Sequence, residues 1–494
     1  INPWIKIYLL SKIFRRCLNN MFLSDLLSIS QWWTTFFLIG IIFIPLTNLI
    51  FPNFIDRGYI FAKIIGIALI SYTVFVLGFL KLLPFNTFNV FVVVGVFILI
   101  NLFLLKKTPL SNIKFRSILP IIFLEELIFI LILLLWSVIH GFQPEIHGLE
   151  KYMDFGFINS TLRAEYFPPK DMWLTPFYIN YYYFGHLVTA VITKASFLNS
   201  PITFNLMLAT IAALSFVSAF SIGANLLFKL NAKLYTLYTI GGGLITAFIL
   251  NFAGSLHSIY LFFKPYPNEN PVPFWQLIFS PSSFPNSYWY PNATRFIENT
   301  IHEFPLYSYV VSDLHGHVLD IPFVLLTIAV LLSLLLDLKI KNLKLKIPLI
   351  SFLLALMYMT NAWDGIIYFA LSLFVVAYII LRLNINLQEI QNSKFRIQNY
   401  ISKLKTAIST LAINVLIIGI GFIIFTLPFN LNFKPFASGI GVICAPEFLT
   451  NIGKVGPFLF EKDHCQHSPL WQLFILYGFF YFWVVSFIIF IKLN

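Results

Sequence analysis

Apolar residues run along this chain in long blocks that short polar stretches separate. Most of these blocks are long enough for a helix to cross a hydrocarbon layer about 30 Å thick. The weak alternation typical of an outer-membrane barrel is absent, so the pattern predicts an all-α, polytopic membrane protein with about 11 transmembrane helices. The predicted spans are about 31–51, 59–82, 86–105, 118–140, 202–228, 235–256, 318–338, 347–361, 364–383, 407–428 and 470–491.

Composition and charge support this interpretation. Of 494 residues, 59% are hydrophobic and only 11% are charged, which excludes a set of soluble domains. The net charge of +12 comes largely from short loops between the apolar blocks, at 106–116, 339–346 and 382–405. By the positive-inside rule these loops are cytoplasmic. The charge therefore indicates orientation in a cell membrane, with lipids as partners, and no nucleic acid is expected.

This orientation determines whether residues 178–198 cross the membrane. If this segment crossed the membrane, one basic loop would change sides, and its polar residues are costly against lipid. We therefore expect a re-entrant or interfacial segment within one external region, 141–200. Two further external loops follow, at 257–317 and 429–469, and every histidine lies at or beyond the outer ends of the spans.

The pattern also divides the chain into parts. Residues 1–20 are interpreted as an upstream extension, residues 21–117 as an N-terminal three-helix membrane segment, and residues 118–494 as the membrane core with the external loops. Cys444 and Cys465 have no metal-site spacing, and they can pair only if their loop faces an oxidising side. The sequence leaves that pairing open.

The first external region contains a pair of acidic residues in "HGLEKYMDF". Glu150 and Asp154 are four residues apart, so a helical turn places both carboxylates on one face with Lys151 beside them. Such a pair can supply a general base at the membrane surface. A solvated loop helix is the alternative.

A second motif, "INYYYFGH", combines Asn180, the triplet Tyr181, Tyr182 and Tyr183, and His186. Hydroxyls, an amide and an imidazole together suit the binding of sugar hydroxyls or a phosphate. An aromatic belt at the level of the lipid headgroups explains the tyrosines equally well, but not the amide and the imidazole.

The second external loop ends in "HEFPLYSYVVSDLHGH". Asp313, His315 and His317 alternate, which puts them on one face of an extended segment and allows a divalent metal ion to bind. His302 and Glu303 are further possible ligands. The alternative is a set of hydrogen-bonded polar residues in a buried outer cleft.

A fourth motif, "TNAWDG", interrupts the apolar region between two spans. Asp364 lies so close to lipid depth that it needs a partner or a cavity, which makes it a candidate for substrate binding. Trp363 is a second candidate there, or else an interfacial anchor.

In order along the chain, these motifs resemble the blocks of the uncharacterised YYY membrane proteins, which take their name from the tyrosine triplet. "FPPKDMWL" at residues 167–174 is a further matching block, and the resemblance extends from about residue 21 through the second half of the chain. Two positions depart from the pattern: Tyr152 stands where proline is expected, and Thr175 where glycine is usual.

That family is similar at the fold level to the GT-C glycosyltransferases, which transfer a sugar from a polyprenyl-phosphate donor at the outer membrane face. The resemblance implies that Asp154, with Glu150 as its alternate, acts on the acceptor, and that Asp313 helps to bind the donor phosphate or a divalent metal ion. We expect the remaining candidates to bind the substrate: Lys151, Arg163 or His186 the phosphate, and Asn180 with Tyr181, Tyr182 and Tyr183 the sugar or lipid head. Fold-level likeness alone does not establish function.

Two other functions stay open. A transporter or flippase of a polar lipid predicts charged residues deep within the spans, for which Glu125 and Glu126 are the candidates. A non-catalytic assembly partner that keeps the fold is the third reading. The accumulation of histidine and acidic residues on the outer face favours the enzyme.

Overall fold

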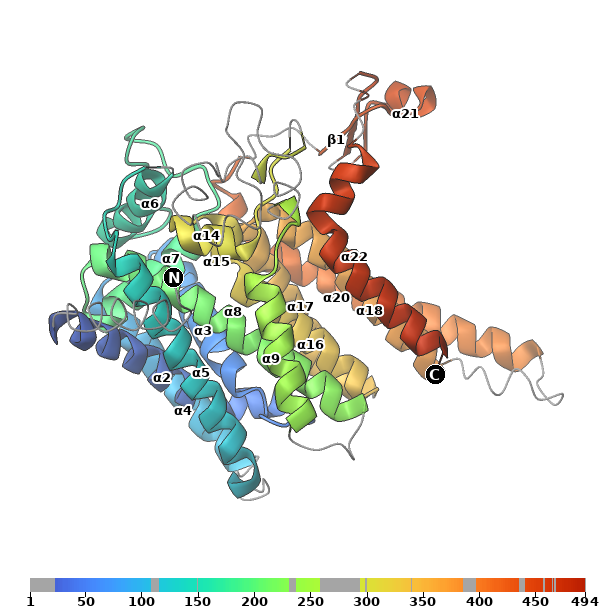
Figure 1. Cartoon of the computed structure of the whole chain (residues 1–494), viewed down its shortest axis with the longest axis horizontal. Coiled ribbons are helices and arrows are strands. Elements are labelled where there is room, and N and C mark those ends of the chain that lie inside the picture. The colour runs from blue at the N-terminus through green and yellow to red at the C-terminus, as the bar shows by residue number, and fades with distance from the viewer. Residues whose placement is uncertain are drawn as a thin grey trace, which may run out of the picture. The chain divides into compact units, whose positions relative to one another are not determined.

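The computed structural model (Figure 1) describes residues 23–107, 115–148, 150–230, 237–257, 294–297, 300–338, 340–384, 397–434, 440–455, 458–463, 465 and 468–493. The chain divides into two compact units. The bundle unit comprises 20–251 and 309–433, and the smaller unit comprises 1–19, 252–308 and 434–494. The extension predicted for residues 1–20 lies outside the described residues.

The described chain is almost entirely helical and confirms the predicted all-α multi-pass architecture. Ten of its helices are long and apolar enough to cross a membrane. The predicted block 235–256 instead forms a shorter apolar helix, α9 (Leu237–Phe252). The long helices are α2 (Leu23–Ile50), α3 (Tyr59–Phe79), α4 (Thr87–Lys107), α5 (Phe115–Gly141), α8 (Ser200–Leu230), α16 (Ile321–Leu336), α17 (Ile340–Thr360), α18 (Ala362–Asn384), α20 (Ile397–Asn430) and α22 (Leu470–Leu493).

Helix α8 is the most buried span of the bundle unit. It packs against α5 on one side and α16 on another, while α2 packs on α3 and α17 packs on both α18 and α20. Small buried residues such as Ala212, Ala213, Ser215 and Ala219 line α8 and let its neighbours approach closely. In a lipid environment this close packing, rather than hydrophobicity, holds helices together.

Two short helices lie within residues 141–200, the segment for which the charge rule predicts an external position. These are α6 (Lys151–Arg163) and α7 (Phe184–Ser196), each 13 residues long. A helix of that length spans about 20 Å, which is too short to cross the hydrocarbon core. Helix α7 is enclosed by α2, α3, α4, α6, α8 and α17, so protein surrounds it and it does not lie exposed at the interface.

Gly185, in the first turn of α7, permits the closest part of this packing. A Cβ atom at this position would lie 2.7 Å from Leu319 Cβ and 2.9 Å from Thr360 Cγ2. Leu319 ends the short helix α15 (Gly316–Leu319), so α7 and α15 meet directly. This approach sets His186, the next residue of α7, near the residues that precede α15.

The smaller unit contains α22, the short helix α21 (Glu447–Ile452) and a three-stranded sheet. The strands β1 (Ile440–Val442), β2 (Lys454–Val455) and β3 (Phe458–Phe460) lie in the order β1-β3-β2, with β1 parallel and β2 antiparallel to β3. A disulfide joins Cys444 to Cys465, the pairing that the sequence left open.

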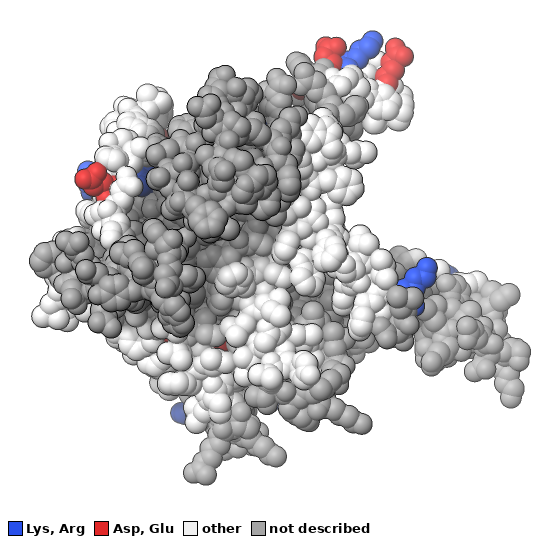
Figure 2. Space-filling model, viewed as in Figure 1, with Lys and Arg blue, Asp and Glu red and all other residues white. Residues whose placement is uncertain are grey.

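The described surface carries few charges. On the face shown in Figure 2, most described atoms belong to uncharged residues, and the few lysine, arginine and acidic side chains lie mainly near its edges. Many large apolar side chains on α4, α18, α20 and α22 are exposed. An apolar, nearly uncharged surface of this kind is typical of helices that contact lipid.

Candidate functional site

The centre of the candidate site is a buried pair formed by Asp154 and His186. Asp154 lies in the first turn of α6, His186 lies in the first turn of α7, and Asp154 Oδ1 is 3.0 Å from His186 Nε2. Both side chains are 0% exposed. The helix α14 (Pro305–Val311) and the loop after it bring further polar groups to this pair from a distant part of the chain.

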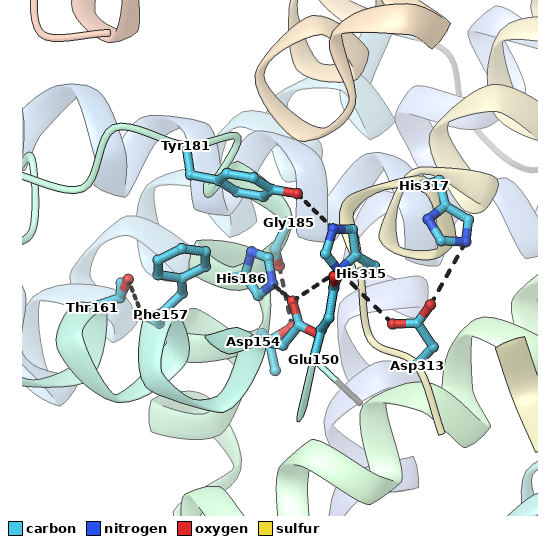
Figure 3. A network of polar contacts seen from close by, with 11 residues as sticks. Glu150, Asp154, Phe157, Thr161, Tyr181, Gly185, His186, Asp313, His315 and His317 are labelled. Carbon is cyan, nitrogen blue, oxygen red and sulfur yellow. Dashed lines mark hydrogen bonds and ion pairs between the residues drawn. The ribbon is translucent and has the colours of Figure 1, made fainter. Parts of the chain in front are cut away.

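His315, at the start of α15, is the residue that connects the site. Its Nδ1 lies 3.1 Å from Glu150 Oε2 and 3.5 Å from Asp154 Oδ1, and its Nε2 lies 2.5 Å from the Tyr181 hydroxyl oxygen (Figure 3). Three segments that are far apart in the sequence therefore meet at one imidazole.

Asp313 extends this network away from Asp154. Its Oδ1 is 3.9 Å from His315 Nδ1, and its Oδ2 is 3.9 Å from His317 Nε2 (Figure 3). The alternating residues Asp313, His315 and His317 thus stay together as predicted, but His315 points toward Asp154 whereas His317 contacts Asp313.

Aromatic rings cover one side of the network. Phe157, one turn after Asp154 on α6, stacks on Tyr181 with ring centroids 5.3 Å apart and meets the His186 ring edge-on at 5.4 Å. These rings exclude water from the Asp154–His186 pair, which strengthens its electrostatic interaction.

The site electrostatics follow from this packing. Burial would lower the pKa of His315, but the hydrogen bond and charge of Asp154, together with the charges of Asp313 and Glu150, raise it to about 9. Burial would raise the pKa of Asp154, but contacts with His186 and His315 hold it below its usual value. At neutral pH we therefore expect a carboxylate at Asp154 and an imidazolium at His315.

Glu150 and Asp154, which the sequence offers as alternatives, differ in their exposure to solvent. The Glu150 side chain is 66% exposed, while Asp154 is fully enclosed. Asp154 Oδ2 and His186 Nδ1 are buried without a hydrogen-bond partner among the described residues. Glu150 can therefore meet a substrate from solvent, whereas Asp154 faces the interior.

Three of these residues are placed to hold a metal ion. One ligand atom each from Asp154, Asp313 and His315 lies within 4.8 Å of the other two. Two carboxylate oxygens and an imidazole nitrogen suit a divalent ion such as Mn²⁺ or Zn²⁺. The unpartnered Oδ2 of Asp154 fits this role, although an ion at His315 Nδ1 must displace the proton held there.

Tyr181 is the member of the tyrosine triplet that contacts His315, and burial together with the charge of Asp154 raises the pKa of its hydroxyl. Tyr182 packs on Tyr181, with ring centroids 5.4 Å apart, and on Phe433 at 5.2 Å. Tyr183 is buried against Phe429 at 5.5 Å.

The other predicted ligands of the first external region differ in their placement. Lys151 is buried beside the network, where burial lowers its pKa and the charge of Asp313 opposes that shift. Arg163 is exposed at the last turn of α6, nine residues after Asp154 and so about 14 Å along the helix. Asn180 is exposed, directly before Tyr181.

Two further predicted groups have partners of their own. Glu303 belongs to the smaller unit, where its Oε1 is 3.9 Å from Arg295 Nη1. Asp364, in the first turn of α18, accepts a hydrogen bond of 2.7 Å from Asn361, and Trp363 beside it is 53% exposed. His464 and His467 lie outside the described residues.

Asp320 is a buried acid that the sequence analysis overlooked. It immediately precedes α16, is fully buried, and lies within hydrogen-bonding distance of Asp364. An acidic residue at the first turn of an apolar span was the available signal. This carboxyl pair explains the position of Asp364, because each acid supplies the partner that the other needs at that depth.

Comparison with known proteins gives the class of this chain, a multi-pass membrane protein, and also its family. Residues 69–494 match the family described as "Uncharacterized membrane protein (DUF2298)". The chain belongs to this family, which confirms the expectation of an uncharacterised membrane protein family. No curated protein and no solved structure matches the chain.

Proposed function

We propose that this protein is a glycosyltransferase that uses a polyprenyl-phosphate sugar at the outer membrane face. The observation that carries the proposal is the convergence of Glu150, Asp154, Asp313, His186 and His315, from three distant segments, on one network with a solvent-facing edge. Paired acids and imidazoles with opposed pKa shifts are typical of acid–base sites.

Glu150 is the best candidate for the base in this reaction. The acceptor oxygen attacks the anomeric carbon, the bond from that carbon to the phosphate oxygen breaks, and the hydroxyl proton moves to the Glu150 carboxylate. The lipid phosphate leaves as an anion without strong acid assistance. Asp154 is a positioning residue here, because its enclosed carboxylate holds the imidazoles of His186 and His315.

The donor phosphate needs a cation, and His315 supplies one. Its raised pKa keeps it protonated at neutral pH, and it is only 18% exposed, so its charge acts in a partly desolvated environment. Lys151 lies nearby as a second cation. Tyr181 and the exposed Asn180 offer hydrogen bonds to the sugar.

The disulfide supports an extracytoplasmic site. Disulfides persist in oxidising compartments, so the Cys444–Cys465 bond favours the outer face for the smaller unit's loop. That agrees with the external position expected for residues 429–469, which follows from basic loops facing the cytoplasm.

A divalent metal ion at Asp154, Asp313 and His315 is an additional proposal. If Mn²⁺ binds there, it should quench the tryptophan fluorescence of the wild type in a saturable way. Asp313→Asn should lose this quenching. Unchanged Mn²⁺ binding in Asp313→Asn would exclude the trio as the site.

The test is incubation of the purified protein in liposomes with polyprenyl-phosphate hexoses, with free polyprenyl phosphate measured by mass spectrometry. We expect Glu150→Gln to lower its release by about 10²- to 10⁴-fold, the usual contribution of a general base. Glu145→Gln is the matched control, because Glu145 is equally exposed, at 68%, in the same external region. No release by the wild type with any donor, or equal rates for both variants, would refute the proposal.

A transporter of a polar lipid remains the second candidate, because charged residues are buried between the spans. Glu126 and Lys63 form an ion pair of 2.7 Å inside the bundle unit. However, Lys63 lies only four residues after the start of α3, near one end of the bundle, whereas transporter sites lie near the midplane. Movement of a fluorescent polyprenyl phosphate between leaflets without cleavage would favour this function.

A further inference from the structure

We propose that Asp56 and Glu125 form a proton-binding site inside the bundle unit, separate from the Asp154 network. Asp56 lies in the turn between α2 and α3, and Glu125 lies on α5. The α3 residue Gly78 packs against Phe167, just beyond the end of α6, whereas Asp56 precedes the other end of α3. The pair is therefore about 30 Å from the outer site along the bundle.

The turn that carries Asp56 is built to hold this carboxylate. Ser221 Oγ donates to Asp56 Oδ2 at 2.7 Å, and Asn225 Nδ2 donates to Asp56 Oδ1 at 3.1 Å. Asn225 Oδ1 also accepts from the Ile55 backbone N–H at 2.7 Å. Gly58 closes the turn with φ of 72°, a conformation that other residues rarely adopt.

Glu125 has no comparable donors. Its side chain is fully buried, and neither carboxylate oxygen has a hydrogen-bond partner among N–H and O–H groups of the described residues. Its carboxyl group lies within hydrogen-bonding distance of the Asp56 carboxyl group. Two carboxylates cannot form a hydrogen bond without a proton, so the contact requires one proton shared by the pair.

The neighbouring charges do not replace this proton. Glu126 is already satisfied, because it accepts from Trp33 Nε1 at 2.7 Å, Tyr59 Oη at 2.6 Å and Lys63 Nζ at 2.7 Å. The Lys63 ammonium group is neutralised by Glu126 and otherwise faces aromatic rings, including Phe129 at 4.7 Å. Loss of the proton would thus leave a buried Glu125 carboxylate, which no described donor satisfies, beside a second carboxylate.

The other described groups around the pair are hydroxyls, an amide and an indole, together with the Lys63 ammonium that Glu126 already neutralises. Helix α2 contributes the Trp33 indole, α3 contributes Tyr59 and Lys63, and α8 contributes Ser221 and Asn225. In the turn itself, the Arg57 guanidinium donates to the Pro52 carbonyl. A proton is the ligand that this set of groups is suited to hold.

The turn also gives the proton a route to water. Asn53, three residues before Asp56, is exposed, and Ile55 and Arg57 are partly exposed. Asp56 itself is buried, so it belongs to a partly exposed turn and at the same time contacts the fully enclosed Glu125. The positive-inside rule assigns this end of the bundle to the cytoplasmic side, so the pair would exchange its proton with the cytoplasm.

Infrared difference spectroscopy of the full chain in nanodiscs tests the proposal. We expect a protonated-carboxyl C=O band at neutral pH that shifts on transfer to D₂O and is lost in Glu125→Gln. In Asp56→Asn the band should remain but change frequency, because its hydrogen-bond partner changes. The wild-type minus Glu125→Gln difference isolates this band from other buried acids, and Glu145→Gln, an exposed acid, should retain it.

Two results would overturn the proposal. One is an unchanged band in Glu125→Gln, which would show that Glu125 carries no proton. The other is a band that does not shift in D₂O, which would show that the proton does not exchange. If Glu125→Gln does not fold, an unaltered band in Asp56→Asn refutes the shared proton. The experiment does not involve sugar transfer, so its outcome is independent of the proposed function.

Discussion

Replacing His315 by glutamine tests the electrostatics of the Asp154 network. The charges of Asp154, Asp313 and Glu150 hold the pKa of His315 at about 9, against 6.5 for an unperturbed histidine. The difference between these two pKa values corresponds to about 3 kcal/mol of stabilisation of the protonated form. This side chain is only 18% exposed, so solvent screening does not remove most of that energy.

The sign of the pH dependence follows from the direction of the shift. The folded pKa lies above the unfolded value, so the stabilisation is complete below pH 6.5 and is lost as the pH rises through about 9. Between these limits the unfolding free energy of the wild type should fall by about 3 kcal/mol relative to His315→Gln, which lacks the titrating group.

Denaturant unfolding in detergent, followed by tryptophan fluorescence at a series of pH values, measures this difference. His147→Gln is the matched control, because the His147 side chain is 52% exposed and pairs with the exposed Glu145. It should keep the wild-type dependence on pH. If His315→Gln and the wild type lose stability in parallel between pH 6.5 and 9, the assignment of a charged His315 is wrong.

Further predictions concern packing and topology. Gly185→Ala should lower the free energy of unfolding by about 1–3 kcal/mol, because the added methyl group overpacks the contact between α7 and α15. Gly241→Ala is the control: its added methyl group meets nothing within 4 Å, so it should be neutral or slightly stabilising. Thermal unfolding of the two variants measures the difference. In a Cys17→Ser background, Tyr152→Cys should react with an impermeant thiol reagent from outside, and Leu345→Cys only from inside. Labelling of both from one side would refute the topology.

Most of the fold could be predicted because hydrophobic length is a local property of the chain. Ten of the predicted apolar blocks correspond to long helices, and the charge rule kept residues 178–198 out of the spanning set. The block 235–256 shows the limit of that reasoning, because its helix ends at Phe252. Hydropathy also gave no sign that α7 would be enclosed by protein, since enclosure depends on contacts with helices far away in the sequence.

The site could be predicted in its residue types but not in its pairing. Asp154 and His186 are 32 residues apart, and Tyr181 and His315 are 134 apart, so no spacing rule connects them. Sequence patterns also grouped Asp364 with the outer candidates, although its partners are Asn361 and Asp320. Pairings of this kind are decided by the tertiary packing of α6, α7 and α15.

The burial of each carboxylate is the property that most changes the chemical roles assigned to Glu150 and Asp154. Helical spacing correctly places Glu150 and Asp154 one turn apart, and the Asp154 N–H bonds to the Glu150 carbonyl at 3.2 Å. Periodicity says nothing about how far each carboxylate lies from water. In the structure Asp154 is enclosed against His186 of α7, whereas Glu150, at the N-terminus of α6, is exposed to solvent. Since a base must meet the acceptor and a positioning group must not be displaced by water, the same two residues take different roles once their burial is known.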